Sequence, residues 1–206
     1  MSNENMLPKD SGARREFSTG AHRDAQDPSK GDCLLLPLVS VGKVFRRIKR
    51  ERLVLSKDEF GSRDVVTVDI VDDPNAVSTT IDEDNARYVF VESISRFTRD
   101  HDLNHLCDAI IAAKVSLDEY KHRTFEYMFM DVSVLYLAGA LKYERNNWRK
   151  GMPLSCYLDS GTRHYFKARD HITDEPHYRG PVWNLLCAMW TAENIQGAFD
   201  ELEIVE

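Results

Sequence analysis

The sequence contains few cysteines, and none is placed as zinc or redox motifs require. The four stand far apart at positions 33, 107, 156 and 187, so no CxxC pair is present. Two disulfides and four free thiols are both compatible with this spacing. We expect free thiols, because disulfides are rare in a reducing cytosol.

Long apolar segments are also lacking. The longest apolar run, residues 33–42, is interrupted by Pro37 and Ser40, and it reaches about half the length of a membrane-spanning helix. The N-terminus lacks the basic start, apolar stretch and cleavage site of a secretory signal. We therefore expect no membrane partner and a cytoplasmic protein.

An excess of basic charge is missing as well. The net charge of −7 argues against binding to a nucleic acid polymer, whose phosphates need a basic surface. The charge is unevenly distributed, however, because residues 142–179 contain eight basic side chains against five acidic ones. Such an island favours a small anion as partner, although a solvated helix face explains the charges equally well.

Hydrophobic periodicity predicts a mainly α-helical domain. Apolar residues recur at helical spacing in five segments, a short helix after Pro37 and helices at about 84–114, 117–141, 153–168 and 181–197. Residues 64–71 alternate as a strand, residues 72–75 form a turn, and residues 87–91 fit a second strand or a helix start. We expect a flexible arm at 1–30 and one domain at 31–206, with a small β-containing insertion at about 46–130.

The predicted helix from Ser155 carries polar groups on adjoining faces. Ser160 and His164 are four residues apart, as are Asp159 and Arg163, and Lys167 follows. Residues at this spacing are neighbours on a helix surface. The cations can bind an anion, or Asp159 and Arg163 can form only a surface ion pair.

The next segment, residues 170–177, concentrates three carboxylates and two imidazoles. Asp174 and Glu175 offer the oxygen ligands that Mg²⁺ prefers, supplemented by substrate phosphates. His177 can position a water or a phosphate oxygen, or cap a helix. Polar loops between helices often have this composition, so a purely structural role also stays open.

A short loop at 146–151 combines two amides, a tryptophan, two cations and a glycine. Trp148 can stack a flat ring, the amides of Asn146 and Asn147 can pair with the edge of a base, and Lys150 can bind an anion. The alternative is a loop that ends a helix and anchors Trp148 in the core.

These stretches occur in one order at compact spacing. They are Gly139–Tyr143, Asn147–Gly151, Tyr157–Ser160, Arg163-His164, Asp174–His177 and Trp183–Leu186, and Thr19–Asp24, Lys30-Gly31 and Leu35–Pro37 precede them. The pattern resembles the dATP/dGTP diphosphohydrolase N-terminal-domain family of bacteriophages and bacteria, which is related to MazG-like pyrophosphohydrolases. The resemblance leaves residues from about 46 to 130 unexplained.

The resemblance implies a MazG-like helical bundle that cleaves a purine deoxynucleoside triphosphate to a monophosphate and pyrophosphate. It also implies Mg²⁺, or Mn²⁺, as cofactor, and the host cytoplasm as location if a phage encodes the chain. We expect His164 and His177 as catalytic residues and Asp174 and Glu175 as metal ligands. The expected substrate-binding residues are Lys142, Asn147, Trp148, Lys150, Arg163, Lys167 and Asn184.

One departure bears on catalysis. MazG-like enzymes bind metal through an ExxE pair, but Val134 and Leu137 stand at the corresponding positions and cannot bind a cation. Either other carboxylates hold the metal, or the chain binds nucleotide without cleaving it. The candidate carboxylates are Asp131, Glu144, Asp170, Asp174 and Glu175.

Relatives of this fold usually assemble as dimers or tetramers. A homo-oligomer is therefore expected, and it is supported by apolar residues in the helices predicted at about 117–141 and 181–197, which are too numerous for one face of a small helical bundle: Leu135, Tyr136, Leu185 and Met189. A purely structural oligomer is the remaining alternative function.

Overall fold

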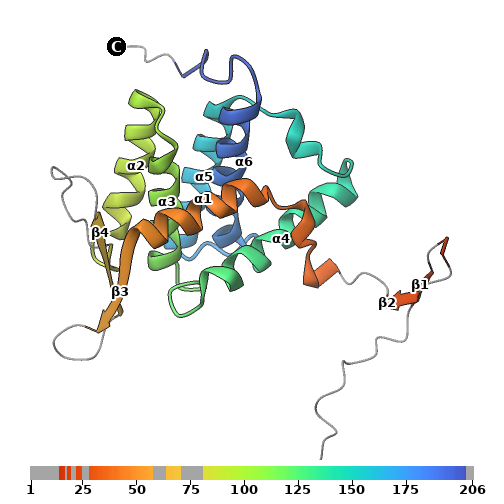
Figure 1. Cartoon of the computed structure of the whole chain (residues 1–206), viewed down its shortest axis with the longest axis horizontal. Coiled ribbons are helices and arrows are strands. Elements are labelled where there is room, and N and C mark those ends of the chain that lie inside the picture. The colour runs from red at the N-terminus through yellow and green to blue at the C-terminus, as the bar shows by residue number, and fades with distance from the viewer. Residues whose placement is uncertain are drawn as a thin grey trace, which may run out of the picture.

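The computed structural model describes residues 14–16, 18–19, 22–24, 28–57, 64–70 and 81–202. Within these ranges the chain forms a bundle of six α-helices with two small antiparallel hairpins beside it (Figure 1). The helices are α1 (Leu38–Arg50), α2 (Ala86–Asp100), α3 (Leu103–Ser116), α4 (Phe125–Lys142), α5 (Leu154–Arg169) and α6 (Gly180–Asn194). The mainly α fold with a small β element, predicted from periodicity, is confirmed.

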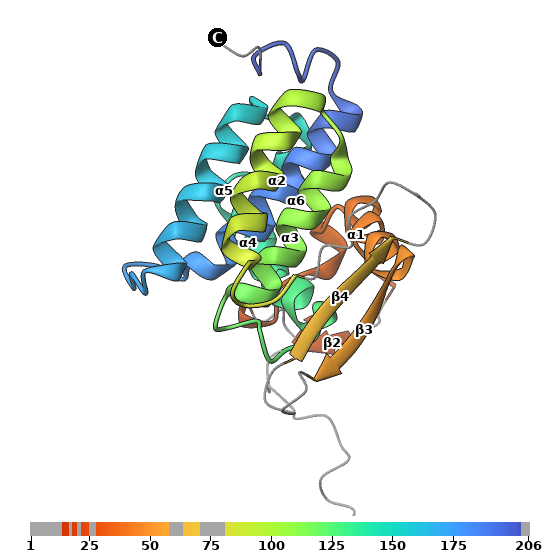
Figure 2. The same ribbon diagram turned by 90° about the vertical axis from the view of Figure 1, so that its left-hand side faces the viewer.

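The hairpin strands are short. β3 (Glu51–Lys57) pairs with β4 (Asp64–Ile70), and β1 (Arg14–Glu16) pairs with β2 (His22–Asp24). Figure 2 shows the β3–β4 hairpin at the side of the helices, following α1. The strand predicted at 64–71 is therefore present. The turn at 72–75 and most of the predicted arm at 1–30 lie outside the described residues.

Residues 84–114, predicted as one helical stretch, form two helices. His101 takes a left-handed conformation with φ 61° and ends α2. The side chain of Asp102 then accepts a hydrogen bond from the backbone N–H of Asn104 at 2.9 Å and begins α3. The chain reverses at this point, so α2 and α3 pack side by side.

We expect the Asp102 cap to contribute about 1 kcal/mol to the free energy of unfolding. Asp102→Ala removes the acceptor at the start of α3 and should lower stability by that amount in urea denaturation. Asp102→Asn keeps an acceptor oxygen and should leave the midpoint nearly unchanged. Equal losses in both variants would contradict a capping role.

The core lies between α3, α5 and α6, with α1, α2 and α4 around it. Phe90 of α2 stacks on Tyr165 of α5 with centroids 3.8 Å apart, and the Tyr165 hydroxyl lies 2.8 Å from that of Ser116 in α3. α2 and α3 fall inside the segment predicted as an insertion. Both helices supply buried residues to the core of the bundle, and the bounds of the predicted insertion stay a prediction.

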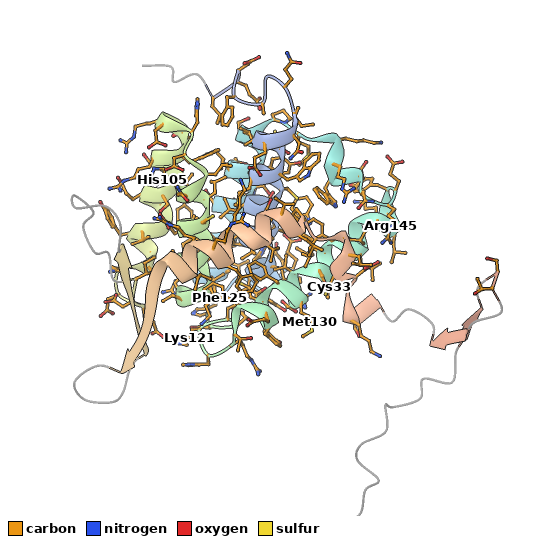
Figure 3. All side chains as sticks on the ribbon, viewed as in Figure 1. Cys33, His105, Lys121, Phe125, Met130 and Arg145 are labelled. Carbon is orange, nitrogen blue, oxygen red and sulfur yellow. The ribbon has the colours of Figure 1, made fainter. Side chains whose placement is uncertain are left out.

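Short 3-10 turns connect the helices and fix the N-terminal segment. η2 (Pro28–Lys30) and η3 (Cys33–Leu35) lie along α4, where Cys33 Sγ is 3.8 Å from Ser133 Oγ. Arg145 Nη1 bonds Asp32 at 3.1 Å, and Figure 3 shows Cys33 and Arg145 on this side of the molecule. η4 (Asn147–Lys150) and η5 (His177–Arg179) precede α5 and α6.

The residues proposed to drive oligomerisation are mostly in the core. Tyr136, Leu185 and Met189 are buried within the single chain, and only Leu135 is partly accessible. The argument from these residues was wrong, because the helix faces they occupy pack against each other. The oligomeric state itself stays a prediction.

Two further properties follow from the coordinates. All four cysteines are free thiols, with Cys33 and Cys156 exposed and Cys107 and Cys187 buried. Among the described residues, no helix is long and apolar enough to cross a membrane.

Candidate functional site

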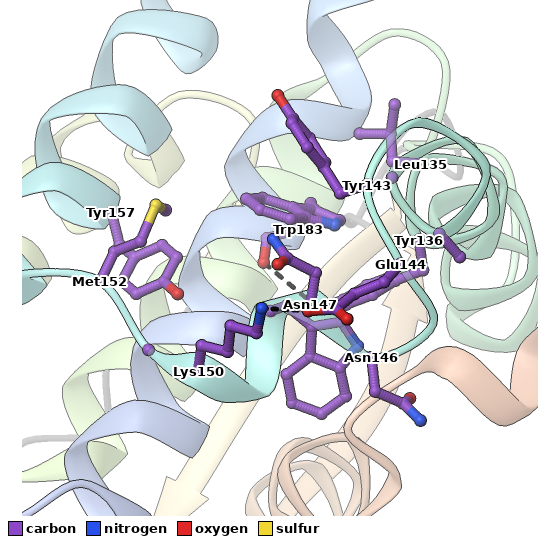
Figure 4. Close-up of a pocket in the computed structure, with 14 residues that line it drawn as sticks. Leu135, Tyr136, Tyr143, Glu144, Asn146, Asn147, Lys150, Met152, Tyr157 and Trp183 are labelled. Atoms are coloured by element: carbon purple, nitrogen blue, oxygen red, sulfur yellow. Dashed lines mark hydrogen bonds and ion pairs between the residues drawn. The ribbon is translucent and has the colours of Figure 1, made fainter.

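A cavity of about 420 Å³ opens between the end of α4, the η4 loop, α5 and α6. Figure 4 shows the labelled side chains converging on it from these elements. Half of its lining residues are aromatic or amide, and the others are apolar, charged or glycine: Leu135, Tyr136, Gly139, Ala140, Tyr143, Glu144, Asn146, Asn147, Trp148, Lys150, Gly151, Met152, Tyr157 and Trp183. Its size lies within the range of small-molecule sites.

The η4 loop forms one wall because its ends have unusual backbone conformations. Asn146 is left-handed at φ 62°, and Gly151 has φ 74° with Ile195 where a side chain would stand. The loop thereby places Trp148 inside, edge-on to Trp190 at 5.2 Å and to Tyr136 at 5.7 Å. Trp148 is thus both a core anchor and a wall of the cavity.

Several polar atoms at this cavity have no hydrogen-bond partner among the described residues. They include Trp148 Nε1, Trp183 Nε1 and Asn146 Oδ1, all buried. Burial raises the pKa of Tyr157 to about 12 and that of Tyr136 well above its usual value, so both phenols stay neutral. Buried polar groups without partners are unfavourable, so these atoms are available to hydrogen-bond a polar ligand.

A second cavity of about 270 Å³ adjoins the first. The two share Leu135, Met152 and Trp183 as lining residues, so they form one groove. The second part is lined mainly by polar and small residues from α5, the segment before η5 and α6: Ser160, His164, Glu175, Pro176, Gly180 and Asn184. The groove therefore has an aromatic part and an imidazole–carboxylate part.

Two histidines meet beside the second cavity, of which His164 lines it and His177 is buried behind it. Nδ1 of His164 lies 2.9 Å from Nδ1 of His177, and Oε1 of Glu175 lies 3.6 Å and 3.2 Å from these atoms. The three side chains form a group whose ligand atoms are close enough to hold a metal ion. Burial lowers the pKa of His164, so its imidazole is neutral near pH 7. The sequence-based prediction placed these residues in one site, and the structure brings them together.

Asp174 has a different neighbour from Glu175. Its carboxylate accepts a hydrogen bond from Nε2 of His177, and Lys167 Nζ approaches its other oxygen at 3.3 Å. The hydrogen bond from His177 is the main cause that holds the pKa of Asp174 below its usual value. Asp174 therefore fixes the His177 ring, while Nδ1 of that ring faces Glu175 and His164.

Glycine at position 180 permits this arrangement. A Cβ on Gly180 would lie 2.5 Å from Cγ of His164, so only glycine lets α6 begin so close to α5. Asn184, one turn further, is buried and donates to the Gly180 carbonyl at 2.8 Å. It faces the second cavity as the prediction of a substrate-binding residue requires.

The remaining predicted residues divide into two sets. Asn147, Trp148 and Lys150 line the aromatic cavity, where Lys150 forms an ion pair with Glu144. Lys142 and Arg163 line neither cavity: Lys142 lies over the Tyr143 ring, and Arg163 pairs with Asp159 at 2.7 Å on the surface. Arg163 therefore forms the surface ion pair with Asp159 that the sequence analysis gave as the alternative to an anion contact.

Sequence reasoning missed three aromatic residues that line the first cavity, and Trp183 lines both cavities. Tyr143, Tyr157 and Trp183 each stand at an end of a stretch that carried the family resemblance. Their motif positions were the available signal. Their shared cavity was not visible, because it depends on how three consecutive helices, α4, α5 and α6, pack against one another.

The described carboxylates do not form the all-oxygen site that Mg²⁺ prefers. Val134 and Leu137 offer no ligand, and the Cβ of an alanine at Gly31 would lie 2.8 Å from the Val134 nitrogen, so the N-terminal segment covers this part of α4. Asp131 is held by Arg179 at 2.7 and 2.9 Å, and Glu144 by Lys150. The residues present do not fit a magnesium centre of the expected kind.

Comparison with known families gives a match to this half of the fold. Residues 112–201, from the end of α3 through α6, match the family described as dATP/dGTP diphosphohydrolase, N-terminal. This part of the chain is similar to that family. The match contains both cavities and the histidine pair, and it confirms the resemblance identified from the motifs.

The comparisons with curated proteins and with solved structures each found no match. The family description therefore supports a diphosphohydrolase-type activity, and the groove supplies what can be said about the ligand.

Proposed function

We propose that this chain binds a purine (deoxy)nucleoside triphosphate in the groove and cleaves it to the monophosphate and pyrophosphate. The observation that carries the proposal is the continuity of an aromatic cavity with an imidazole–carboxylate cavity through Trp183, Met152 and Leu135. A nucleotide has the same division into a flat ring and a charged chain. The family described for residues 112–201 supports the reaction type.

The base occupies the aromatic cavity in this proposal. Tyr143 and Trp183 offer ring faces, and stacking on such rings tolerates any purine. The unpartnered N–H groups of Trp148 and Trp183 and the carbonyl oxygen of Asn146 supply hydrogen bonds to a heterocycle. Asn147 adds an amide at the same wall.

The phosphates extend toward His164, Glu175 and His177. Lys167, which approaches Asp174, supplies positive charge beside this cluster. A water held at the cluster attacks the α-phosphorus and loses a proton to the cluster. The bond from the α-phosphorus to the bridging oxygen breaks, and pyrophosphate leaves with the electron pair. Positioning contributes most of the acceleration in such a step.

A second candidate function is nucleotide binding without cleavage. It is favoured by Val134 and Leu137, which replace the acidic pair of MazG-like enzymes. A chain that kept the groove and lost turnover would sequester a nucleotide.

One experiment separates these functions. The full chain is incubated with dATP, dGTP, ATP, GTP and the pyrimidine triphosphates, with Mg²⁺, Mn²⁺ or Zn²⁺, and both pyrophosphate release and thermal shift are measured. Release with a purine substrate supports the enzyme. A thermal shift without release supports the binder, since a ligand that prefers the native state stabilises it. Absence of both would overturn the assignment of a nucleotide to the groove.

Gly139 provides a direct test of the aromatic cavity. A Cβ at this position meets no atom within 4 Å, and Gly139 lines the cavity, so Gly139→Leu places a side chain in the empty space. We expect at least a tenfold loss of nucleotide affinity by calorimetry, equal to about 1.4 kcal/mol. Folding should be retained, because removal of a helical glycine is favourable by about 0.5–1 kcal/mol.

The matched control is Ala138→Leu. Ala138 is the preceding residue of α4, is exposed and lines neither cavity. The Ala138→Leu substitution adds the same side chain outside the groove and should leave the affinity for nucleotide unchanged. Equal affinity of both variants and the parent chain would place the ligand elsewhere.

A further inference from the structure

We infer that His164, Glu175 and His177 form a site for one divalent transition-metal ion of the zinc class, in place of the magnesium centre expected from the family. The inference deepens the proposed function, because it gives the cluster that holds the attacking water a metal ion. It stands on the geometry of the three side chains, and metal alone tests it.

The distances between the three ligand atoms suit a shared ion. An ion bonded to nitrogen and oxygen at about 2.1 Å keeps neighbouring ligand atoms about 3.0–3.4 Å apart, from octahedral to tetrahedral angles. The separations here are 2.9 Å between the two Nδ1 atoms and 3.2 Å and 3.6 Å from them to Oε1 of Glu175. All three are within a few tenths of an ångström of that range.

The cluster is also held in place as metal sites are. The side chain of His177 is only 1% exposed, and its second nitrogen, Nε2, bonds the carboxylate of Asp174. A carboxylate on the far nitrogen fixes the tautomer of a metal-binding imidazole and increases its basicity. With the proton on Nε2, the lone pair of Nδ1 faces Glu175 and His164.

The types of ligand decide which ion fits. Two imidazoles and one carboxylate suit Zn²⁺ and its neighbours, whereas Mg²⁺ takes oxygen ligands. Asp174, the other acid that was predicted to bind magnesium, is engaged by His177 and Lys167. For Mg²⁺ the cluster therefore offers one suitable ligand, the carboxylate of Glu175. For a zinc-class ion all three side chains are suitable ligands.

Open positions remain on the side of the substrate. His164 and Glu175 line the 270 Å³ cavity, so a fourth ligand from water or phosphate can enter there. Three protein ligands and one open position are typical of catalytic zinc sites. The alternative occupant is a proton shared between the two imidazoles at 2.9 Å, and the experiment distinguishes it from a metal.

The test uses the full chain after treatment with a chelator. Zn²⁺, Co²⁺ and Mg²⁺ are titrated separately, and bound metal is counted by equilibrium dialysis with elemental analysis. We expect one Zn²⁺ per chain, bound at least 100-fold more tightly than Mg²⁺. With Co²⁺, we expect the visible absorption spectrum of an ion that has a low coordination number. No stoichiometric Zn²⁺, or equal affinity for Mg²⁺, would overturn the inference and leave a shared proton.

Variants locate the site. Glu175→Gln and His164→Gln remove ligands at accessible positions and should each weaken Zn²⁺ binding at least tenfold. Asp174→Asn leaves the three ligands in place and should weaken it by about 10-fold or more through loss of the carboxylate on His177. His171→Asn is the control, because His171 is exposed, lies outside the cluster and has the positive φ that asparagine tolerates.

The outcomes for metal and nucleotide are separable. Unchanged Zn²⁺ affinity in Glu175→Gln and His164→Gln, with circular dichroism showing native folding, would reject this site even if nucleotide binding is found. Stoichiometric Zn²⁺ at the cluster without any nucleotide response would keep the metal site and reject the proposed function.

Discussion

Replacement of Gly31 by alanine is expected to lower the free energy of unfolding by about 2–5 kcal/mol. Gly31 has φ +67°, a conformation that costs an alanine about 1–2 kcal/mol. Its added Cβ would lie 2.2 Å from Ser133 Oγ and 2.8 Å from the Ser133 carbonyl carbon and the Val134 nitrogen. Two of these atoms are backbone of α4, so relief requires movement of the segment, and overpacking of this kind costs about 1–3 kcal/mol.

Urea denaturation followed by circular dichroism measures the effect, with Gly139→Ala as control. Gly139 is also a glycine of this region, lying in α4 itself, but a Cβ there meets no atom within 4 Å. The Gly139→Ala substitution should therefore stabilise the protein by up to about 1 kcal/mol, because alanine has a higher helix propensity than glycine. If Gly31→Ala were as stable as the parent chain, the N-terminal segment would not dock on α4 as described.

The packing of the N-terminal segment on α4 accounts for one departure from the MazG-like pattern, the apolar residues at positions 134 and 137. The resemblance to MazG-like enzymes predicts metal-binding acids at positions 134 and 137, whereas here Leu137 is buried and the backbone at Gly31 lies against Ser133 and Val134. A carboxylate in this packed position would lose hydration without gaining a partner. The apolar residues at 134 and 137 therefore agree with the packing observed.

The sequence was informative where local chemistry determines structure. Apolar spacing gave the helices after Pro37, at 153–168 and at 181–197, which correspond to α1, α5 and α6. The break between α2 and α3 was missed, because it depends on one left-handed histidine at 101 inside an otherwise helical pattern. Asp102, a favourable cap just after it, was the available signal.

The site was predictable in part for a related reason. His164 and His177 belong to adjoining segments, so the turn between α5 and η5 returns one to the other, and their motif positions pointed to both. The aromatic cavity required the packing of α4 against α6, and no periodicity specifies which faces meet. For the same reason Leu185 and Met189 were wrongly assigned to an oligomer interface. The sequence pattern identifies them as apolar, but it does not tell whether they are buried within the chain, as they are.

A second large effect is expected at Asp131, which connects α4 to the segment carrying His177. Its two oxygens accept from Arg179 at 2.7 and 2.9 Å, and Oδ2 also accepts from the Tyr120 hydroxyl at 2.9 Å. The side chains of Asp131 and Arg179 are 13% and 19% exposed, so the pair is largely shielded from water. Asp131 raises the pKa of Arg179, and burial, followed by Asp131, raises the pKa of Tyr120.

Asp131→Ala leaves the guanidinium of Arg179 shielded without a charge partner and removes the acceptor of Tyr120. Loss of one partner of a buried ion pair costs about 3–5 kcal/mol, and we expect about 3 kcal/mol here because both groups keep some access to water. The measurement is urea denaturation. Asp159→Ala, which breaks the exposed pair with Arg163, is the control and should cost less than about 0.5 kcal/mol.

The double variant Asp131→Leu/Arg179→Met tests the cause of the loss. Replacing both charged partners with apolar side chains removes the unpaired charge, so stability should recover most of the way toward that of the parent chain. A double variant as unstable as Asp131→Ala would assign the loss to packing or to Tyr120. Because Arg179 is two residues from His177, the single variant should also loosen the histidine cluster and weaken Zn²⁺ binding, whereas Asp159→Ala should leave that binding unchanged.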